Sequence, residues 1–558
     1  MAVAAVSKVV LGSVAFSVFW VLAVFPAVPV LPIGRTAGAL LSAMLMVLFG
    51  VMTPEQAFNS IDLPILALLF SMMVVSAYLE RADLFGHLGA LLSWRSKGAK
   101  DLLFRVCLVA AFFTNDTACV VLTAFVLKLA RRNNLPPRPF LLALASSANV
   151  GSAATPIGNP QNLVIASLSG ITFGRFLLGL LPAMLLGVLI NAAILLIFFF
   201  KQLSDNNDVD EANNNPASDA GDPLDEEDVI SHRFSPATMS HLTSVDSEDL
   251  ISTLAFFSRD SSLNGAPHIN QSKILTFYYP IDRIHPQFLH WIAETLRNRA
   301  CSGAEDAATT TESTEPANST PPQESAAAAV AVDVIEEAAA RQGRRRRVRH
   351  MVKRFKKHYL WRTCVYLVTV GMLVALLMGL NMAWTALTAA LALIVLDFTD
   401  AQPCLEKVSY SLLIFFCGMF ITVDGFNRTG IPSAFWDFIE PHARVDKPGG
   451  IALLALVVIF LSNIASNVPT VLLLGAPVAA SAARISSGAE SKAWLILAWV
   501  STVAGNLTLL GSAANLIVCE QAQRVKSNGY TLSFFAHLPF GCLSTLVVTA
   551  VGLLLIRE

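Results

Sequence analysis

The chain has 558 residues, of which 54% are hydrophobic and only 14% are charged, and its formal net charge is −1. Apolar runs of the about 20 residues that a bilayer requires recur along it, which excludes an ordinary soluble domain and indicates an all-α polytopic membrane protein. The net charge identifies no partner, because charges in a membrane protein sort by side rather than by sum.

Ten apolar runs follow in chain order, five on each side of a long polar block. The first begins after Lys8 and is too long for a signal-peptide core, so we expect it to be a membrane span. The eight cysteines are scattered singly, which predicts neither a disulfide framework nor a metal site. The runs lie at about 9–30, 37–52, 62–79, 140–168, 173–200, 360–380, 384–397, 408–426, 493–519 and 533–556.

The polar block divides the chain into a first membrane region (1–200), a linker (201–359) and a second membrane region (360–558). The acidic stretch "DNNDVDEANNNPASDAGDPLDEED" and the low complexity that follows it predict a largely disordered linker. The linker ends in the polybasic "RQGRRRRVRHMVKRFKKHYLWR", directly before the next span. This run places the linker in the cytosol and predicts contact with membrane lipids; nucleic-acid binding is disfavoured.

An internal duplication relates the two membrane regions. Four segments match in the same order, with offsets of 349, 347, 352 and 353 residues, and together they indicate two structural repeats. The pairs are "TAGALLSA" (36–43) with "TALTAALA" (385–392), "LFSMMVVSAYLER" (69–81) with "FCGMFITVDGFNR" (416–428), "FFTNDTA" (112–118) with "IASNVPT" (464–470), and "TPIGNPQNLVI" (155–165) with "TLLGSAANLIV" (508–518).

The segment 101–130 sets the orientation of the repeats. As a single helix it would be about 45 Å long and would place Lys100 and Lys128 on opposite sides of the membrane, against the charge rule. A re-entrant hairpin that turns at "TNDT" (114–117) keeps both ends in the cytosol, and we prefer it to the single span. The matching hairpin is 450–483, with its turn at "SNVPT" (466–470).

Each repeat then has about five crossings and one hairpin. Five is odd, so the repeats are inverted, an arrangement typical of secondary transporters whose broken helices meet near the bilayer midplane. Both chain termini are expected outside the cell, which depends on the hairpin interpretation.

The stretch "TPIGNP" (155–160) must interrupt the apolar run 140–168, because proline removes a donor and clashes with the preceding turn. The freed backbone groups must meet protein, water or a solute. The uncharged polar side chains around the break suit a small hydroxyl-rich or oxyanionic solute, although they could instead only cap the broken ends. The expected substrate-binding residues are Asn115, Thr117, Thr155, Gly158, Asn159, Asn162, Asn467, Thr470, Thr508, Gly511, Ser512 and Asn515.

Asp116 is the acid expected deep in the membrane at a break. Intramembrane carboxylates mark ion or proton pathways by default, so Asp116 is the candidate proton-coupling residue. The alternative is that Asp116 only caps its own hairpin turn. No nucleotide-binding motif or nucleophile elbow occurs, so the sequence predicts neither an enzyme nor a cofactor.

Several stretches resemble the plant silicon efflux transporters, which belong to a wider ion-transporter superfamily with arsenite permeases and divalent-anion/sodium symporters. They are "FPAVPVLPIGRTAGALL" (25–41), "SIDLPILALLF" (60–70), "FFTNDTACVVLT" (112–123) and "ANVGSAATPIGNPQNLVIA" (148–166). The superfamily carries Ser-Asn-Thr at both hairpin tips, where it holds a carboxylate and sodium. Here the tips read Thr114-Asn115-Asp116 and Ser466-Asn467-Val468, which is more similar to the arsenite and silicon branch.

The resemblance implies export of silicic acid across the plasma membrane, driven by proton antiport, with an elevator-like motion. Arsenite is the second expected substrate, since As(OH)₃ is also a neutral polyhydroxy solute. The alternatives are an arsenite or anion permease without a silicon role and, from another class, a non-transporting receptor or scaffold. A homo-oligomer is left open.

Overall fold

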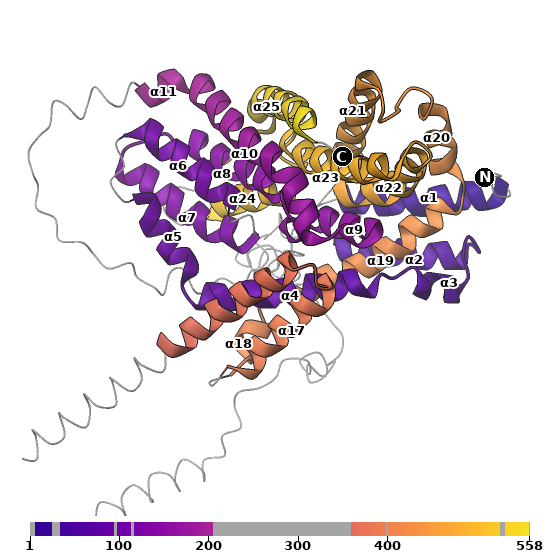
Figure 1. Cartoon of the computed structure of the whole chain (residues 1–558), viewed down its shortest axis with the longest axis horizontal. Coiled ribbons are helices and arrows are strands. Elements are labelled where there is room, and N and C mark those ends of the chain that lie inside the picture. The colour runs from indigo at the N-terminus through magenta and orange to yellow at the C-terminus, as the bar shows by residue number, and fades with distance from the viewer. Residues whose placement is uncertain are drawn as a thin grey trace, which may run out of the picture. The chain divides into compact units, whose positions relative to one another are not determined.

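The computed structural model describes residues 6–24, 34–93, 98–112, 116–204, 359–397, 400–524 and 530–556. Within these ranges all regular secondary structure is helical (Figure 1). The described helices belong to one unit that contains both sequence halves. Residues 205–358 lie outside the described ranges, so the prediction of a disordered cytosolic linker is untested.

The first half supplies eleven of the described α-helices and one 3₁₀ turn. These are α1 (Val6–Val24), α2 (Arg35–Leu48), α3 (Pro54–Asn59), α4 (Leu63–Arg81), α5 (Leu84–Ser93), α6 (Ala99–Phe112), α7 (Asp116–Arg132), α8 (Pro137–Ser152), η1 (Pro156–Gly158), α9 (Pro160–Ser169), α10 (Phe173–Phe198) and α11 (Phe200–Ser204).

The second half begins with an apolar helix, Tyr359–Leu377. The helices that follow are α17 (Met382–Val395), α18 (Gln402–Leu405), α19 (Tyr410–Asn427), α20 (Ile431–Ile439), α21 (Pro448–Ala465), α22 (Asn467–Ala483), α23 (Ser487–Val503), η2 (Ala504–Asn506), α24 (Ala513–Arg524) and α25 (Phe534–Leu555).

Seven helices in the described part are long and apolar enough to cross a membrane, which confirms a polytopic helical membrane protein. Of the ten predicted spans, 37–52 is shorter than expected, since α2 has only 14 residues. The run 384–397 agrees in length with α17, which also has 14 residues and begins two residues earlier. Conversely, Pro448–Ala465 is long enough to span, although the sequence assigned it to half of a hairpin. The predicted runs 140–168 and 493–519 are each broken into two helices.

Several helices, among them α4 and α17, begin at a side-chain cap. The carboxylate of Asp62 accepts the Ile65 N–H at 3.0 Å at the start of α4, and the side-chain oxygen of Asn381 accepts the Trp384 N–H at 3.1 Å at the start of α17. Such bonds satisfy amide groups that have no partner within the helix.

The starts of α6 and α8 lie at the same end of α10. The Lys100 ammonium is 4.0 Å from the ring centre of Phe200, and the Arg138 guanidinium is 5.4 Å from that of Phe199. At the other end of the pair, a Cβ on Gly151 would meet the Ala111 carbonyl oxygen at 2.0 Å. The two helices therefore run side by side in the same direction.

The start of α21 and the end of α22 lie beside one short segment. The Glu440 carboxylate accepts from the Ser481 hydroxyl and from the Arg484 guanidinium, both at 2.7 Å. Four residues later in the chain, the Arg444 backbone contacts the Gly450 position near the start of α21. The two helices are separated only by Ser466, whose φ of +74° interrupts the helical path.

A buried ion pair joins α4 to the second half. The Arg81 guanidinium donates to the Asp397 carboxylate at 2.6 Å, and the carboxylate also accepts from the Tyr78 hydroxyl at 3.2 Å. The Asp397 side chain is fully buried. Arg81 additionally lies 5.0 Å from the ring centre of Trp361. Figure 1 shows α17 and α18 beside α4, where this cluster connects them.

Candidate functional site

The first break separates α8 from α9 and is closed by one side chain. The Asn162 amide nitrogen lies 3.0, 3.3 and 3.2 Å from the carbonyl oxygens of Ser152, Ala153 and Thr155. Asn159 caps α9, since its side-chain oxygen accepts the Asn162 N–H at 2.8 Å. Asn162 is fully buried. The carbonyls released by the prolines are therefore satisfied by protein, as a nonaqueous setting demands.

The second break separates α23 from α24 and is built in the same way. The Asn515 amide nitrogen donates to the carbonyls of Gly505 at 2.8 Å and Thr508 at 2.9 Å. Ser512 takes the capping position, and its hydroxyl accepts the Asn515 N–H at 3.1 Å. Without prolines, this break depends on glycines: a Cβ on Gly511 would lie 2.8 Å from the Gly505 carbonyl oxygen.

Asn149 of α8 reaches across to the second break. Its amide nitrogen lies 2.8 Å from the Ser512 hydroxyl, 2.8 Å from the side-chain oxygen of Asn506 and 3.1 Å from that of Asn515. Asn149 is 6% exposed, so these contacts replace water in an interior position.

Thr502 of α23 reaches across to the first break in return. Its hydroxyl lies 3.3 Å from the Asn162 side-chain oxygen and accepts from the Asn159 amide at 3.1 Å. Asn149 and Thr502 are 353 positions apart, as are Asn162 and Asn515. Each half therefore supports the broken helix of the other with residues at matching positions.

The turn between α21 and α22 lies against the second break. The Asn467 amide approaches the Gly511 carbonyl at 3.4 Å, while its buried side-chain oxygen has no hydrogen-bond partner among the described residues. Asn463, one turn earlier, accepts from the Thr508 hydroxyl at 3.0 Å. The Thr470 hydroxyl is turned back onto the Ser466 carbonyl at 2.9 Å.

The structure thus brings together most of the predicted substrate-binding residues that it describes. Asn159, Asn162, Asn467, Thr508, Gly511, Ser512 and Asn515 contact one another directly or through one neighbour; Thr155 contributes its carbonyl, and Gly158 lies against Ser152, where a Cβ would meet the carbonyl oxygen at 2.2 Å. Whether they bind a solute stays a prediction.

The first hairpin tip lies at the edge of the described residues. Asn115 lies outside the described residues, and the side chains of Asp116 and Thr117 are likewise outside them, although both residues belong to the first turn of α7. α7 packs against α8, which precedes the first break, and against α24, which follows the second break.

Sequence reasoning missed the residues that connect the halves. Asn149 and Thr502 lie in apolar helices and Asn506 lies directly after one, where a lone polar residue is usually a satisfied core residue. A signal was present: the 353-residue offset that pairs Asn162 with Asn515 also pairs Asn149 with Thr502.

The site carries donors and acceptors without charge. The described members of the two breaks and of the Asn467 turn are amides, hydroxyls and backbone groups, with no Lys, Arg, Asp or Glu among them. α9 and α24 both start at the breaks, and the N-terminus of a helix carries partial positive charge. Such a site suits a neutral or weakly anionic solute with several hydroxyl groups.

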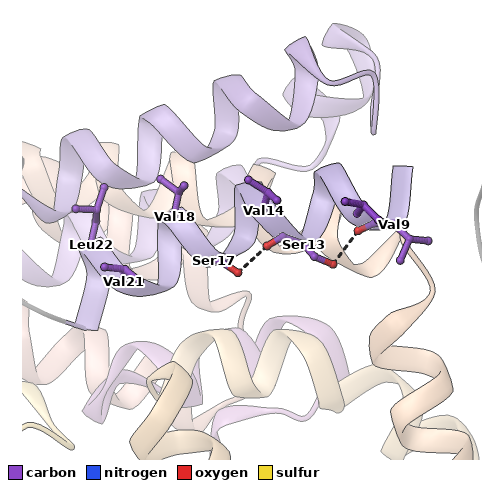
Figure 2. Close-up of a pocket in the computed structure, with 8 residues that line it drawn as sticks. Val9, Ser13, Val14, Ser17, Val18, Val21 and Leu22 are labelled. Carbon is purple, nitrogen blue, oxygen red and sulfur yellow. Dashed lines mark hydrogen bonds between the residues drawn. The ribbon is translucent and has the colours of Figure 1, made fainter. Parts of the chain in front are cut away.

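A separate hydrophobic groove runs along α1, with a volume of about 630 Å³ (Figure 2). Its lining is formed by valines and Leu22, with Ser13 and Ser17 between them. Both hydroxyls donate to carbonyls of their own helix, Ser13 to Val9 and Ser17 to Ser13. The groove therefore offers little to a polar solute and suits an acyl chain.

Residues 17–504 match the family model described as a citrate transporter, CitMHS. The chain belongs to the CitMHS family. The chain is similar to Silicon efflux transporter LSI3 of Oryza sativa subsp. japonica, with 49% identity over 562 residues, covering 100% of this chain and 99% of the rice protein. Another similar protein is Putative transporter arsB of Dictyostelium discoideum, 30% identical over 531 residues, covering 94% of this chain and 87% of that protein.

These relatives show a CitMHS membrane transporter rather than an enzyme. They also confirm the resemblance to silicon efflux transporters that the motifs around Asn149 and Thr155 indicate.

Proposed function

We propose that this chain exports silicic acid from the cell by proton antiport. The observation that carries the proposal is the uncharged, cross-connected pair of helix breaks, in a chain that is 49% identical over its full length to a protein named for silicon efflux. Silicic acid is a neutral tetrahydroxy solute, so amides, hydroxyls and helix termini can replace its hydration without a counter-charge.

Citrate, the solute in the family's description, fits the described site less well. A tricarboxylate needs cationic partners, preferably arginine forks, when it leaves water. The described members of the breaks provide none.

The inverted-repeat architecture is part of the proposal. Reciprocal bonds between Asn149 and the second break, and between Thr502 and the first, support an internal two-fold relation. Two features of the proposal agree with this relation: the halves have opposite orientations in the membrane, and the breaks lie at the bilayer midplane.

Re-entrant hairpins are supported at both expected places. The parallel course of α6 and α8, which Gly151 and Ala111 indicate, requires α7 to run back between them. Glu440 and Arg444, close to opposite ends of the α21–α22 pair, favour a fold-back at Ser466. An elevator-like motion would carry these hairpins and breaks together.

Proton coupling is assigned to Asp116. Export against a gradient requires an energy source, and each inward proton supplies about 2.3 kcal/mol per 100 mV of membrane potential, in addition to the pH term. α7, which begins at Asp116, packs against one helix of each break, α8 and α24, and this supports a place for the proton close to the solute path.

The remaining parts of the proposal concern the setting of the transporter. The protein would act in the plasma membrane, with the 201–359 linker in the cytosol and its polybasic end on anionic lipid. Homo-oligomer formation is compatible with the mechanism but not required by it.

Arsenite permeation is the second candidate. The likeness to the Dictyostelium protein named putative transporter arsB favours it, and As(OH)₃ offers hydroxyls to the same uncharged groups. One solute need not exclude the other.

Oocytes preloaded with labelled silicic acid test the main proposal. Efflux above that of water-injected cells, increased by an acidic medium, is expected; no efflux above this control would remove it. Adding arsenite to the preload measures competition, and an oocyte that releases only arsenite would establish the second candidate instead.

A further inference from the structure

A buried histidine contacts the second helix break. His537, in the first turn of α25, is 4% exposed, and its Nε2 lies 2.9 Å from the carbonyl oxygen of Asn506 in η2. A carbonyl only accepts, so Nε2 must carry the hydrogen and donate it. This contact assigns the tautomer and leaves Nδ1 as the nitrogen with a free lone pair.

Nδ1 is also buried, and among the described residues no donor lies within hydrogen-bonding distance of it. An unpaired buried acceptor is unusual in folded proteins and calls for an explanation. Histidine is also the side chain whose charge ordinarily changes between about pH 5 and 8. An unpaired imidazole nitrogen at this place can accept a proton without breaking the bond that Nε2 makes.

The histidine is connected to the solute site through Asn506. The side-chain oxygen of Asn506 accepts from Asn149 at 2.8 Å, and Asn149 in turn contacts Ser512 of the second break. Gly541 makes the approach feasible, since a Cβ there would lie 2.7 Å from the Asn506 carbonyl oxygen and 2.8 Å from Nε2. The ring is therefore linked to Ser512 by three hydrogen bonds in series.

The surroundings of the ring include few charges. Arg138, at the start of α8, donates to the Ala536 carbonyl at 2.5 Å and acts electrostatically on the ring. Of the elements packed against α25, α10 carries Arg175 near its start and α23 carries Glu490 and Lys492 near its start, while η2 carries no titratable side chain.

Those three residues lie far from the ring along their helices. Phe198, at the end of α10, shares Phe540 as a neighbour with His537, so Arg175 is at the opposite end of a 26-residue helix. Trp499 of α23 contacts Thr549, three turns beyond His537, and Glu490 is further away still. Arg138 is thus the charge that a proton on the ring would face.

We propose that His537 binds a transported proton, or one that gates transport, and that its protonation acts on the second helix break through the Asn506 carbonyl. This proposal rests on the proposed proton-coupled export and adds a second proton-binding residue to Asp116. In the neutral state the ring donates one bond to the break. In the protonated state that bond becomes charge-assisted, and the new cation beside Arg138 favours a conformation that admits water or solute to Nδ1.

The variant His537→Gln tests the proposal, because glutamine can donate to the Asn506 carbonyl but does not titrate. Thr549→Val, on the same buried face of α25 and without contact to Asn506, is the matched control. Reconstituted vesicles loaded with labelled silicic acid are assayed from pH 5 to 8. We expect the control to keep the wild-type pH profile. In H537Q, the change in efflux rate between pH 5 and 8 should be at least threefold smaller than in wild type, while downhill efflux persists. An unchanged profile in H537Q overturns the proposal.

A second measurement covers a variant that is folded but does not transport. Silicic acid is added to purified protein in weakly buffered detergent solution with a pH indicator, and bound or released protons are counted. The number of protons bound or released per protein should differ between H537Q and wild type by up to one. An equal number in the two proteins overturns the role of His537. Absence of silicic acid transport by wild type would instead refute the proposed substrate, and the H537Q comparison would then be made with arsenite.

Discussion

Asn162 and Asn515 close their respective helix breaks by the same bonds: each donates its side-chain amide to the carbonyls of the residues ten and seven positions before it. The two asparagines are also the third residues after the caps, Asn159 and Ser512. The proline-rich break and the glycine-based break are thus two sequence solutions for one geometry.

Replacing either asparagine by leucine should have similar effects. Asn162→Leu and Asn515→Leu each remove the side-chain donor of at least two carbonyls at a break. The Thr155 and Thr508 carbonyls keep the Gly158 and Gly511 N–H groups, so the cost falls on the remaining carbonyls, at about 1–3 kcal/mol of folding free energy for each that is left unpaired. We expect efflux near background and a lower midpoint of thermal unfolding in detergent for both variants. Efflux assays and melting curves measure the two effects.

The control for these variants is Asn381→Ala, which removes an exposed helix cap and should cost about 1 kcal/mol while sparing transport. If Asn515→Leu transported like wild type while Asn162→Leu did not, the site would not be two-sided.

Asp116→Asn should remove the dependence of efflux on an inward proton gradient and leave expression intact. Asparagine preserves size and polarity but cannot carry a proton, so only downhill movement of silicic acid should survive. Efflux at several external pH values measures this, with Asp62→Asn, a cap at the start of α4, as the control. An unchanged pH profile would mean that another residue carries the proton.

Gly158→Ala should disrupt the first break. The added Cβ would lie 2.2 Å from the Ser152 carbonyl oxygen, and relief requires a backbone shift that typically costs about 1–3 kcal/mol. We expect at least a tenfold loss of efflux. Gly371→Ala is the matched control, since nothing lies within 4 Å of its added Cβ. Equal activity of the two alanine variants would show that the break tolerates displacement.

Arg81→Ala should lower stability more than most single substitutions, because it removes the guanidinium that donates to the fully buried Asp397 carboxylate. Breaking a fully buried pair costs about 3–5 kcal/mol, and this pair should cost less because the Arg81 side chain is 31% exposed; replacing both partners by apolar residues can be close to neutral. Thermal unfolding in detergent should therefore rank wild type and Arg81→Leu/Asp397→Leu above Arg81→Ala. A double variant as unstable as the single one would contradict this account.

Much of the arrangement could be predicted from local signals. Pro156 and Pro160 make the first break unavoidable, and the duplication extends it to Gly505 and Gly511, where local sequence alone is ambiguous. The end of α2 was not predicted, since its apolar run continues to residue 52 whereas the helix ends at Leu48, and hydropathy does not record where backbone bonding stops.

The cross-connections were beyond sequence reasoning for a different reason. Asn149 reads as an ordinary interior residue, because nothing within its own helix shows that its partners are Asn506, Ser512 and Asn515, more than 350 positions away. The duplication indicates which residues correspond, but only the packing of the halves shows that each supports its counterpart.

The reciprocal bonds of Asn149 and Thr502 have a consequence for biogenesis. When the first half emerges from the ribosome, Asn149 has no Ser512 or Asn515 to contact, and its amide must stay solvated until the last helices are inserted. When the second half is inserted, the Asn149 amide becomes paired, so a completed chain exposes fewer unpaired amides within the membrane than an unfinished one. Cellular quality control that recognises unpaired polar groups in spans could use this difference to separate unfinished molecules from finished ones.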